Sequence, residues 1–115
     1  MISQREIVLI SFPFSDLQTS KVRPAVVMSK DSYNSRSGDF IAVPLTSNLK
    51  AKGYTLLITN KELESGNLVV DSKAKVDRIF SVSQSLVRMT VGKVKTETYQ
   101  SLVRILVGLV SAGKR

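Results

Sequence analysis

The sequence contains no cysteine and no histidine. The absence of cysteine excludes disulfides, thiolate metal sites and cysteine nucleophiles. The absence of histidine removes the commonest general acid–base group, the commonest metal ligand and the serine–histidine triad. The acidic residues show no spacing typical of a metal site, and no glycine-rich loop with a lysine is present to cradle phosphates. We therefore expect no metal and no cofactor.

Long hydrophobic runs are also missing, because the longest uninterrupted apolar runs, such as residues 7–10, have four residues. Such runs are too short for a helix that spans a bilayer. The first ten residues lack the basic segment and long apolar stretch of a signal peptide. We expect a cytoplasmic protein in which residues 1–115 form a single domain, since 43% of the residues are apolar and this length supports one core.

Acidic residues are few: 9 Asp and Glu stand against 17 Lys and Arg, which gives a net charge of +8 and a pI near 10.1. On so small a domain this excess predicts a polyanionic partner, with nucleic acid first and an acidic protein second. An anionic membrane is third, because no basic amphipathic helix is present. The alternative is that the charge only maintains solubility, since the basic residues are spread along the chain.

Short segments rich in β-branched and aromatic residues predict five to seven strands. The ranges are 6–12, 22–28, 40–45, 54–59, 68–79 as one long strand or two, and 88–94. Polar connections are expected at 15–20, 29–39, 49–53 and 82–86, with one helical turn in 60–67 closed by Gly66. Pro24 cannot donate a ladder hydrogen bond, so it should lie at a strand start or on an edge.

The C-terminal part of the chain predicts one helix, from Thr96 as N-cap to about Ser111, with Glu97 in its first turn. Apolar side chains form a stripe at helical spacing, and further ones widen it onto a second face. The stripe consists of Tyr99, Leu102, Val103, Leu106, Val107 and Val110, and the second face adds Ile105 and Leu109. One face can pack on the sheet, and we expect the other to pack on a second copy of the chain. The alternative is a fully buried helix in a monomer.

Together these elements predict a mainly β fold with a C-terminal helix, in which the sheet curls into a small barrel. Polar residues lie at the ends of its apolar strands: Arg23, Thr46 with Ser47, and Lys73, Lys75, Asp77 and Arg78. In a strand, residues two apart point to the same face, so Lys73, Lys75 and Asp77 would line one face.

Each of these polar residues has two interpretations. A lysine beside a carboxylate can hold a phosphate while the carboxylate moves a proton, or it can be a surface ion pair worth ~0–1 kcal/mol. Arg23 is either a phosphate-binding group or a solvated arginine at a strand edge. Thr46 and Ser47 are either part of a site or residues of a turn or cap.

Four segments together resemble the MazF/PemK toxins, which have the Kid/CcdB fold. EIVLISFPFSDLQTSKVRPAVVMS (6–29) is similar to the family's amino-terminal signature, in which Arg-Pro-Ala precedes a buried strand. FIAVPLTS (40–47) is similar to its third strand, which ends in Thr-Ser. KVDRIFSVSQSLV (75–87) resembles the later strand and turn, and VGKVKTETYQSLVRILVGL (91–109) the closing strand and helix. The resemblance covers nearly the whole chain, and Arg-Pro-Ala with Thr-Ser at this distance is its most specific part.

The resemblance implies an SH3-like barrel with a C-terminal helix, usually a homodimer. It implies the toxin of a type II toxin–antitoxin system, a ribosome- and metal-independent endoribonuclease that cuts single-stranded RNA, including mRNA, at short sequences. It also implies an acidic antitoxin protein that blocks the RNA groove.

The resemblance also implies roles for single residues. Arg23 falls on the family's catalytic arginine and Thr46 on its catalytic threonine, while Ser47 follows as a substrate-contacting hydroxyl. Lys75 and Asp77 fall on a cation–carboxylate pair that some members use for catalysis. Further RNA contacts are expected from Lys21, Pro24, Lys73 and Arg78.

The chain departs from the family pattern at three places. Residues 15–22 form a shorter loop without glycine or glutamate, and Phe80 stands where many members have an arginine. Lys75 replaces an arginine of the cation–carboxylate pair, which keeps the charge and loses the bidentate fork for phosphate.

RNA carries its own nucleophile, the 2′-hydroxyl, so cleavage needs a base, a cation for the pentavalent phosphorane and an acid for the leaving 5′-oxygen. Arg23 is the expected phosphorane stabiliser, and Thr46 would position the scissile phosphate. With no histidine, Asp77 is the candidate base, and a carboxylate suits that task near neutral pH only when burial raises its pKa. Lys75 or Arg23 would protonate the 5′-oxygen.

Two other functions remain open at this stage. The first is a non-catalytic basic barrel that binds nucleic acid through summed charge, whose binding would weaken steeply with salt and ignore single substitutions. The second is a toxin of the same fold that acts on DNA gyrase. That activity would depend on the C-terminal residues 111–115, of which Ala112 and Gly113 offer little to bind, and would not need Arg23.

Overall fold

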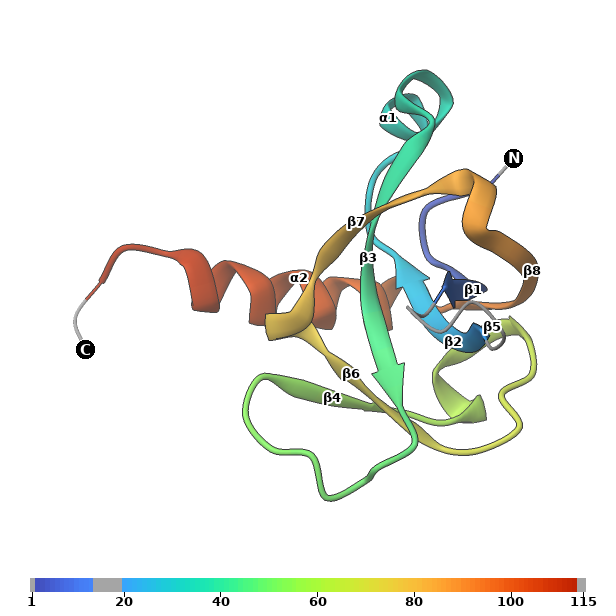
Figure 1. Ribbon diagram of the computed structural model, residues 1–115. Coiled ribbons are helices and arrows are strands. Elements are labelled where there is room, and N and C mark those ends of the chain that lie inside the picture. Colours follow the sequence, from blue (N-terminus) through green and yellow to red (C-terminus); the bar gives the residue numbers. More distant parts are fainter. Residues whose placement is uncertain (1, 14–19, 114–115) are drawn as a thin grey trace.

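Eight strands and a long C-terminal helix make up the computed structural model, which describes residues 2–13 and 20–113 (Figure 1). The strands are β1 Glu6–Pro13, β2 Ser20–Val27, β3 Asp39–Thr46, β4 Thr55–Ile58, β5 Leu63–Gly66, β6 Ser72–Lys75, β7 Phe80–Ser83 and β8 Val87–Val94. The helices are α1 Asp31–Ser37 and α2 Thr96–Val110, with short 3-10 helices η1 Asn60–Glu62, η2 Val76–Arg78 and η3 Gln84–Leu86. Most of the predicted turn 15–20 and the last two residues of the tail lie outside the described residues.

The strands pair antiparallel in the order β4-β6-β3-β2-β1-β8-β5, and β7 pairs with β3 beside β6. The sheet curls into a half-barrel, so the predicted mainly β fold with a C-terminal helix is confirmed (Figure 1). No helix in the described part of the chain is long and apolar enough to cross a bilayer.

The central strands are buried on both faces, because alternate side chains enter two separate apolar clusters. On β2, Val26 belongs to the first cluster, while Ala25 and Val27 belong to the second. The first cluster lies between the sheet and α2 and includes Leu102. The second cluster includes Phe40. Burial on two faces explains why these segments are continuously apolar rather than alternating.

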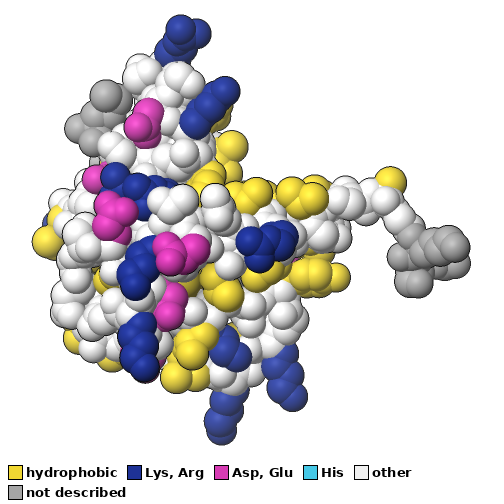
Figure 2. Space-filling model, turned by 180° about the vertical axis from the view of Figure 1, so that it is seen from behind, with side chains coloured by type: hydrophobic (Ala, Val, Ile, Leu, Met, Phe, Trp, Pro, Cys, Tyr) yellow, Lys and Arg dark blue, Asp and Glu magenta, His cyan; other side chains and the backbone are white. Residues whose placement is uncertain are grey.

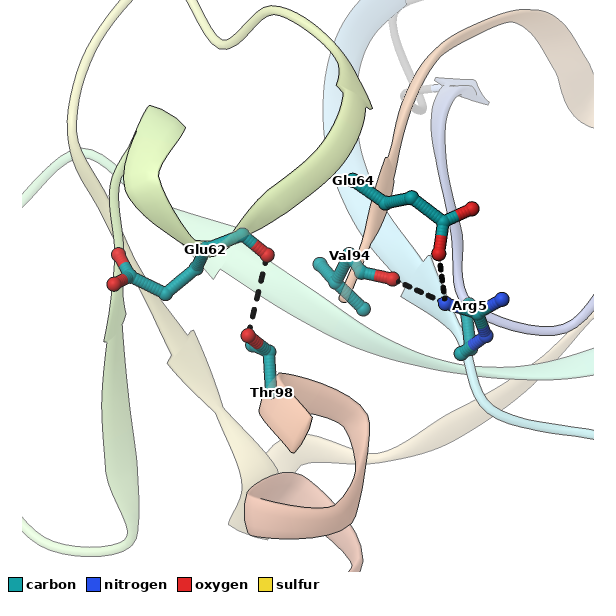
Figure 3. Close-up of polar contacts among 5 residues, drawn as sticks. All are labelled: Arg5, Glu62, Glu64, Val94 and Thr98. Carbon is teal, nitrogen blue, oxygen red and sulfur yellow. Dashed lines mark hydrogen bonds and ion pairs between the residues drawn. The ribbon is translucent and has the colours of Figure 1, made fainter. Parts of the chain in front are cut away.

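The helix α2 is fastened to the barrel at its first turns. Leu102 is fully buried, and the Thr98 hydroxyl donates to the Glu62 carbonyl at 3.2 Å (Figure 3). The helix ends at Val110, close to the predicted end, but Lys95 and not Thr96 is its N-cap, without a side-chain hydrogen bond. The predicted cap was wrong. The hydroxyl that stabilises the start of α2 is that of Thr98, inside the helix, and it bonds a carbonyl distant in sequence rather than a neighbouring backbone N–H.

Arg5 joins three strands beside this helix. Its guanidinium donates to the Val94 carbonyl at 2.7 Å and forms an ion pair with Glu64 at 3.1 Å (Figure 3). These contacts tie the start of β1 to β5 and the end of β8. They hold the chain where α2 leaves the sheet.

The predicted polar loop 29–39 contains the helix α1. Asn34 is buried, and its side chain accepts from the Ser29 hydroxyl at 2.5 Å and donates to the Ser29 carbonyl at 3.0 Å. Gly38 ends the helix in the left-handed region, with φ 73°. The helix was missed because a buried amide and a glycine cap specify it, and no apolar stripe marks it.

The predicted strand over 68–79 is also wrong in its extent. Only Ser72–Lys75 forms a strand, and η2 follows at once. Leu68 is instead a buried core residue, whose N–H donates to Asn60 Oδ1 at 2.8 Å. Gly66 does not close a helical turn but belongs to β5, where a Cβ would lie 2.2 Å from the Val91 carbonyl oxygen. An apolar run can fill a core without joining a ladder, and its composition does not show which.

Candidate functional site

Arg23 on β2 and Thr46 at the end of β3 lie in one row across the sheet. The β2–β3 ladder ends at the pair Ala25–Pro44, and the same offset continued by two residues puts Arg23 and Thr46 on one face of the sheet, just beyond that last pair. The β3–β6 register pairs Thr46 with Lys73. Opposite residues of antiparallel strands share a face, so these side chains form what we call the Arg23–Thr46–Lys73 row. Paired Cα atoms are about 5 Å apart, which sets the spacing of Thr46 and Lys73.

The row lies where an apolar face meets solvent. Ile10, the partner of Arg23 on β1, is fully buried in the second cluster, and Ala25 and Ala42 are buried on the same face. Arg23 is exposed and Thr46 is half-buried. The strands therefore provide a rigid base, and the polar ends of the side chains can reach a ligand.

Thr46 also shapes the loop that follows it. Its hydroxyl oxygen accepts from the Asn48 N–H at 3.1 Å, and the Asn48 side chain accepts from the Lys50 N–H at 3.1 Å. The turn interpretation of Thr46 is therefore part of the structure. The hydroxyl hydrogen remains able to donate to a phosphate oxygen, so the turn and a role in a site are compatible. Ser47 follows the strand and is exposed.

Lys73 and Lys75 both lie on β6 and are half-buried. The ammonium of Lys73 donates to the Ala51 carbonyl at 2.9 Å, a contact between the strand and the β3–β4 loop. Lys75 lies opposite Thr55 on β4, two residues along the same face. One of the three N–H groups of Lys73 is thus occupied within the protein.

Asp77 is not on β6, so strand alternation does not place it beside these lysines, which corrects that expectation. The strand ends at Lys75, and Asp77 and Arg78 lie in η2, both exposed. Lys75 and Asp77, both within the described part, form no ion pair. Helical turns break the two-residue periodicity on which the expectation depended.

Pro24 faces away from the row. It lies opposite Leu9, and both line an apolar hollow of about 160 Å³ together with Leu68 and Val91. The β2–β3 pairing begins at Ala25, so β2 has no partner on its β3 side at Pro24, and the predicted edge position is confirmed. The predicted RNA contact of Pro24 would therefore be on the opposite face from Arg23.

Two features of this region were not anticipated. The rings of Phe12 and Phe80 pack with centroids 5.9 Å apart, so Phe80, noted only as a departure from the family pattern, completes the apolar face beside the row. Lys21, exposed, lies opposite Phe12. In the β3–β4 loop, the exposed Lys50 and Lys52 flank Ala51, whose carbonyl accepts from Lys73 of the row. The sequence of residues 49–53, LKAKG, is basic, but nothing in it shows which part of the sheet the loop contacts.

The arrangement can bind and polarise an anion that carries several oxygens. A guanidinium, a hydroxyl and two lysine ammonium groups lie on one face of the sheet. Among residues 2–13 and 20–113, no three acidic side chains come together where they could hold a metal ion. The residues therefore suit phosphate chemistry by positive charge and hydrogen bonding.

Comparison with known proteins identifies the family of this chain. The family model of the PemK-like, MazF-like toxin of type II toxin–antitoxin systems matches residues 3–109. No curated protein sequence matches the chain.

Solved structures share the fold over nearly their full lengths. The MazE–MazF complex from Deinococcus radiodurans (form II) is 20% identical, with 97% of each chain covered and a TM-score of 0.79. An endoribonuclease in complex with its cognate antitoxin from a mycobacterial species is 16% identical, with 100% of each chain covered and a TM-score of 0.75. The Mycobacterium tuberculosis toxin MazF-mt6 is 10% identical, with 93% of this chain and 99% of that chain covered and a TM-score of 0.70.

Proposed function

Because this chain belongs to the family of PemK-like, MazF-like toxins of type II toxin–antitoxin systems, we propose that it is an endoribonuclease that cuts single-stranded RNA at short sequences. The single observation that carries the proposal is the Arg23–Thr46–Lys73 row, in which an exposed guanidinium and a half-buried hydroxyl lie on one face of the sheet at the edge of an apolar cluster. The names of the similar structures, which include endoribonucleases, support the same activity.

The proposed reaction uses the 2′-hydroxyl of the RNA as nucleophile and needs no metal. The 2′-oxygen forms a bond to phosphorus, the bond to the 5′-oxygen breaks, and the products are a cyclic phosphate and a free 5′-hydroxyl. Arg23 stabilises the charge that develops on the phosphorane oxygens, and the Thr46 hydroxyl positions the phosphate. Asp77 is the proposed acceptor of the 2′-hydroxyl proton, and Lys75 or Arg23 donates a proton to the 5′-oxygen.

An open, positively charged surface suits a long polymer. Arg23 and Ser47 are exposed, as are Lys21 and Arg78, the proposed RNA contacts at either side of the row. Lys and Arg side chains are spread over the molecule, as Figure 2 shows for one face, and the net charge is +8. This distribution attracts RNA from many directions, while the row provides the chemistry at one place.

The same charge favours an acidic antitoxin as the protein partner. Two of the similar structures contain a toxin together with its antitoxin. We propose that an acidic segment of such a protein competes with RNA for the positively charged surface. The segment would be disordered until it binds.

The helix α2 supports the proposal of a homodimer. Its first turns pack on the sheet, but its second half projects from the barrel and carries apolar side chains (Figures 1 and 2). Val107 and Val110 are 52% and 71% exposed. A second copy of the chain would bury this stripe, which a monomer of this size leaves in water.

The experiment incubates the purified protein with a long single-stranded RNA in EDTA and maps the new ends. We expect cuts at one short sequence. Arg23→Ala should slow cleavage by about 100-fold or more, and Thr46→Ala by about tenfold or more, because each removes a group that stabilises the phosphorane. Arg23 is exposed, so Arg23→Ala should change the free energy of unfolding by less than about 0.5 kcal/mol.

Arg88→Ala is the matched control, since Arg88 is an exposed arginine on β8. It should cut like the wild type. Full activity in Arg23→Ala would refute the proposal. RNA binding without cutting, with a steep dependence on salt and none on Arg23, would indicate a non-catalytic nucleic-acid-binding protein instead.

A further inference from the structure

The loop at residues 47–54 joins β3 to β4 and begins beside Thr46. Its first half is a hydrogen-bonded turn, since Thr46 and Asn48 accept from backbone N–H groups and the Ala51 N–H donates to the Asn48 carbonyl at 3.1 Å. The second half, up to β4, has an internal contact from the Thr55 N–H to the Gly53 carbonyl at 2.8 Å, and the Tyr54 carbonyl accepts from the Val76 N–H of η2 at 2.9 Å. These backbone contacts hold the two ends of the loop, so the connection of its middle to the sheet must come from elsewhere.

A side chain from another strand supplies that connection. The Lys73 ammonium donates to the Ala51 carbonyl at 2.9 Å, across 22 residues of sequence. Lys73 itself lies opposite Thr46, so the bond runs from the Arg23–Thr46–Lys73 row to the middle of the loop. Ala51 is half-buried, as is Lys73, which limits competition from water.

The loop carries charge that a ligand of the row would meet. Lys50 and Lys52 flank Ala51 and are exposed, and Tyr54, at the far end of the loop, is 48% exposed. Holding the Ala51 carbonyl therefore also restrains the backbone of these two lysines near Lys73. A lysine whose backbone is already held loses less conformational entropy when a phosphate binds to it.

We propose that Lys73 is a positioning residue that fixes the β3–β4 loop, so that Lys50 and Lys52 bind the backbone of an RNA lying on the row. The proposal rests on the endoribonuclease function proposed above and adds a role to it. Lys73 acts through Ala51 and the loop, and the phosphate contact that it was expected to make comes from Lys50 and Lys52, the sequence neighbours of Ala51. The bond depends on tertiary structure, because Lys73 and the Ala51 carbonyl belong to a strand of the row and to the loop that follows its neighbouring strand.

The first test measures hydrogen exchange of the backbone amides at residues 48–55 in the absence of RNA. Lys73→Met removes the donor and keeps the length of the side chain, so exchange in this loop should become about tenfold faster or more. Lys73→Arg keeps a donor and should restore protection close to that of the wild type. Lys61→Met is the matched control, because Lys61 is an exposed lysine on η1, and it should leave the loop unchanged.

The second test measures RNA cleavage with the same variants. Lys73→Met should raise KM about fivefold and leave kcat within about twofold, because it weakens binding of the RNA backbone and spares the groups of the phosphorane. Lys73→Arg should restore KM. The double variant Lys50→Met with Lys52→Met should raise KM in the same way, and adding Lys73→Met to it should change KM little further.

Several results would overturn the proposal. Equal loop exchange in the wild type and Lys73→Met would show that the bond does not hold the loop. A fall in kcat at unchanged KM would show that Lys73 acts on the reacting phosphate. If the wild-type protein cuts no RNA, the proposed endoribonuclease function fails, and the exchange measurement still decides whether Lys73 fixes the loop.

Discussion

Leu102 is the side chain on which the attachment of α2 depends most. It has no exposed surface and lies in the apolar cluster between the helix and the sheet. Leu102→Ala removes three carbon atoms from a site with no solvent to fill the gap, and such changes cost about 3 kcal/mol, within a range of roughly 2–5 kcal/mol. A domain of this size has only about 5–15 kcal/mol of net stability, so the variant loses a large share of it.

The assay is urea or thermal unfolding at one fixed protein concentration, since self-association would make the midpoint depend on concentration. A domain of about this length loses roughly 4 °C in Tm for each kcal/mol, so we expect a fall of about 12 °C. Val69→Ala is the control, because Val69 is 93% exposed, and it should shift the free energy of unfolding by less than about 0.5 kcal/mol. A loss below about 1 kcal/mol in Leu102→Ala would refute the described packing of α2.

Two further predictions follow from single groups. The Thr59 N–H and hydroxyl each donate to Glu62 at 2.7 Å and hold the pKa of Glu62 below its usual range. The stability that this lowered pKa provides is complete above the unfolded pKa, about 4.3, and is lost as pH falls through the folded pKa. Glu62→Gln removes this titrating group and should therefore flatten the acid limb of a curve of unfolding free energy against pH. An equally steep acid limb in the variant would contradict the prediction. Val107→Glu places a charge on the exposed stripe of α2 and should shift the protein toward monomer in sedimentation equilibrium. The control Val69→Glu, at another exposed valine, should leave the association unchanged. Unchanged association in Val107→Glu would show that this face of α2 is not the dimer interface.

The strands were largely predictable from sequence because β-branched and aromatic runs have few alternatives in so short a chain. The observed β1, β2, β3, β4 and β8 begin and end within about two residues of the predicted ranges. The helix α2 was predictable from its stripe, down to its end near Ser111. The helix α1 and the short η2 were not, because single hydrogen bonds and caps specify them rather than periodicity.

The candidate site was also predictable from the sequence only in part. The resemblance pointed to Arg23 and Thr46, and the strand register puts them on one face of the sheet, just beyond the last β2–β3 pair. That juxtaposition depends on how far β2 and β3 are offset, which composition does not reveal. Asp77 was expected beside Lys75 because the strand was expected to continue, and one helical turn placed it elsewhere.

By itself, the sequence determined the positive charge, the lack of thiol and imidazole chemistry, the apolar strands and the amphipathic helix, because each of these follows from residue type and local spacing. Only the tertiary structure decided which polar residues meet. Arg23, Thr46 and Lys73 are 23 and 27 residues apart along the chain, and antiparallel pairing brings them into one row. The bond from Lys73 to Ala51 likewise depends on a loop meeting a strand 22 residues later. Contacts of this kind arise from register and curvature, which are properties of the whole sheet.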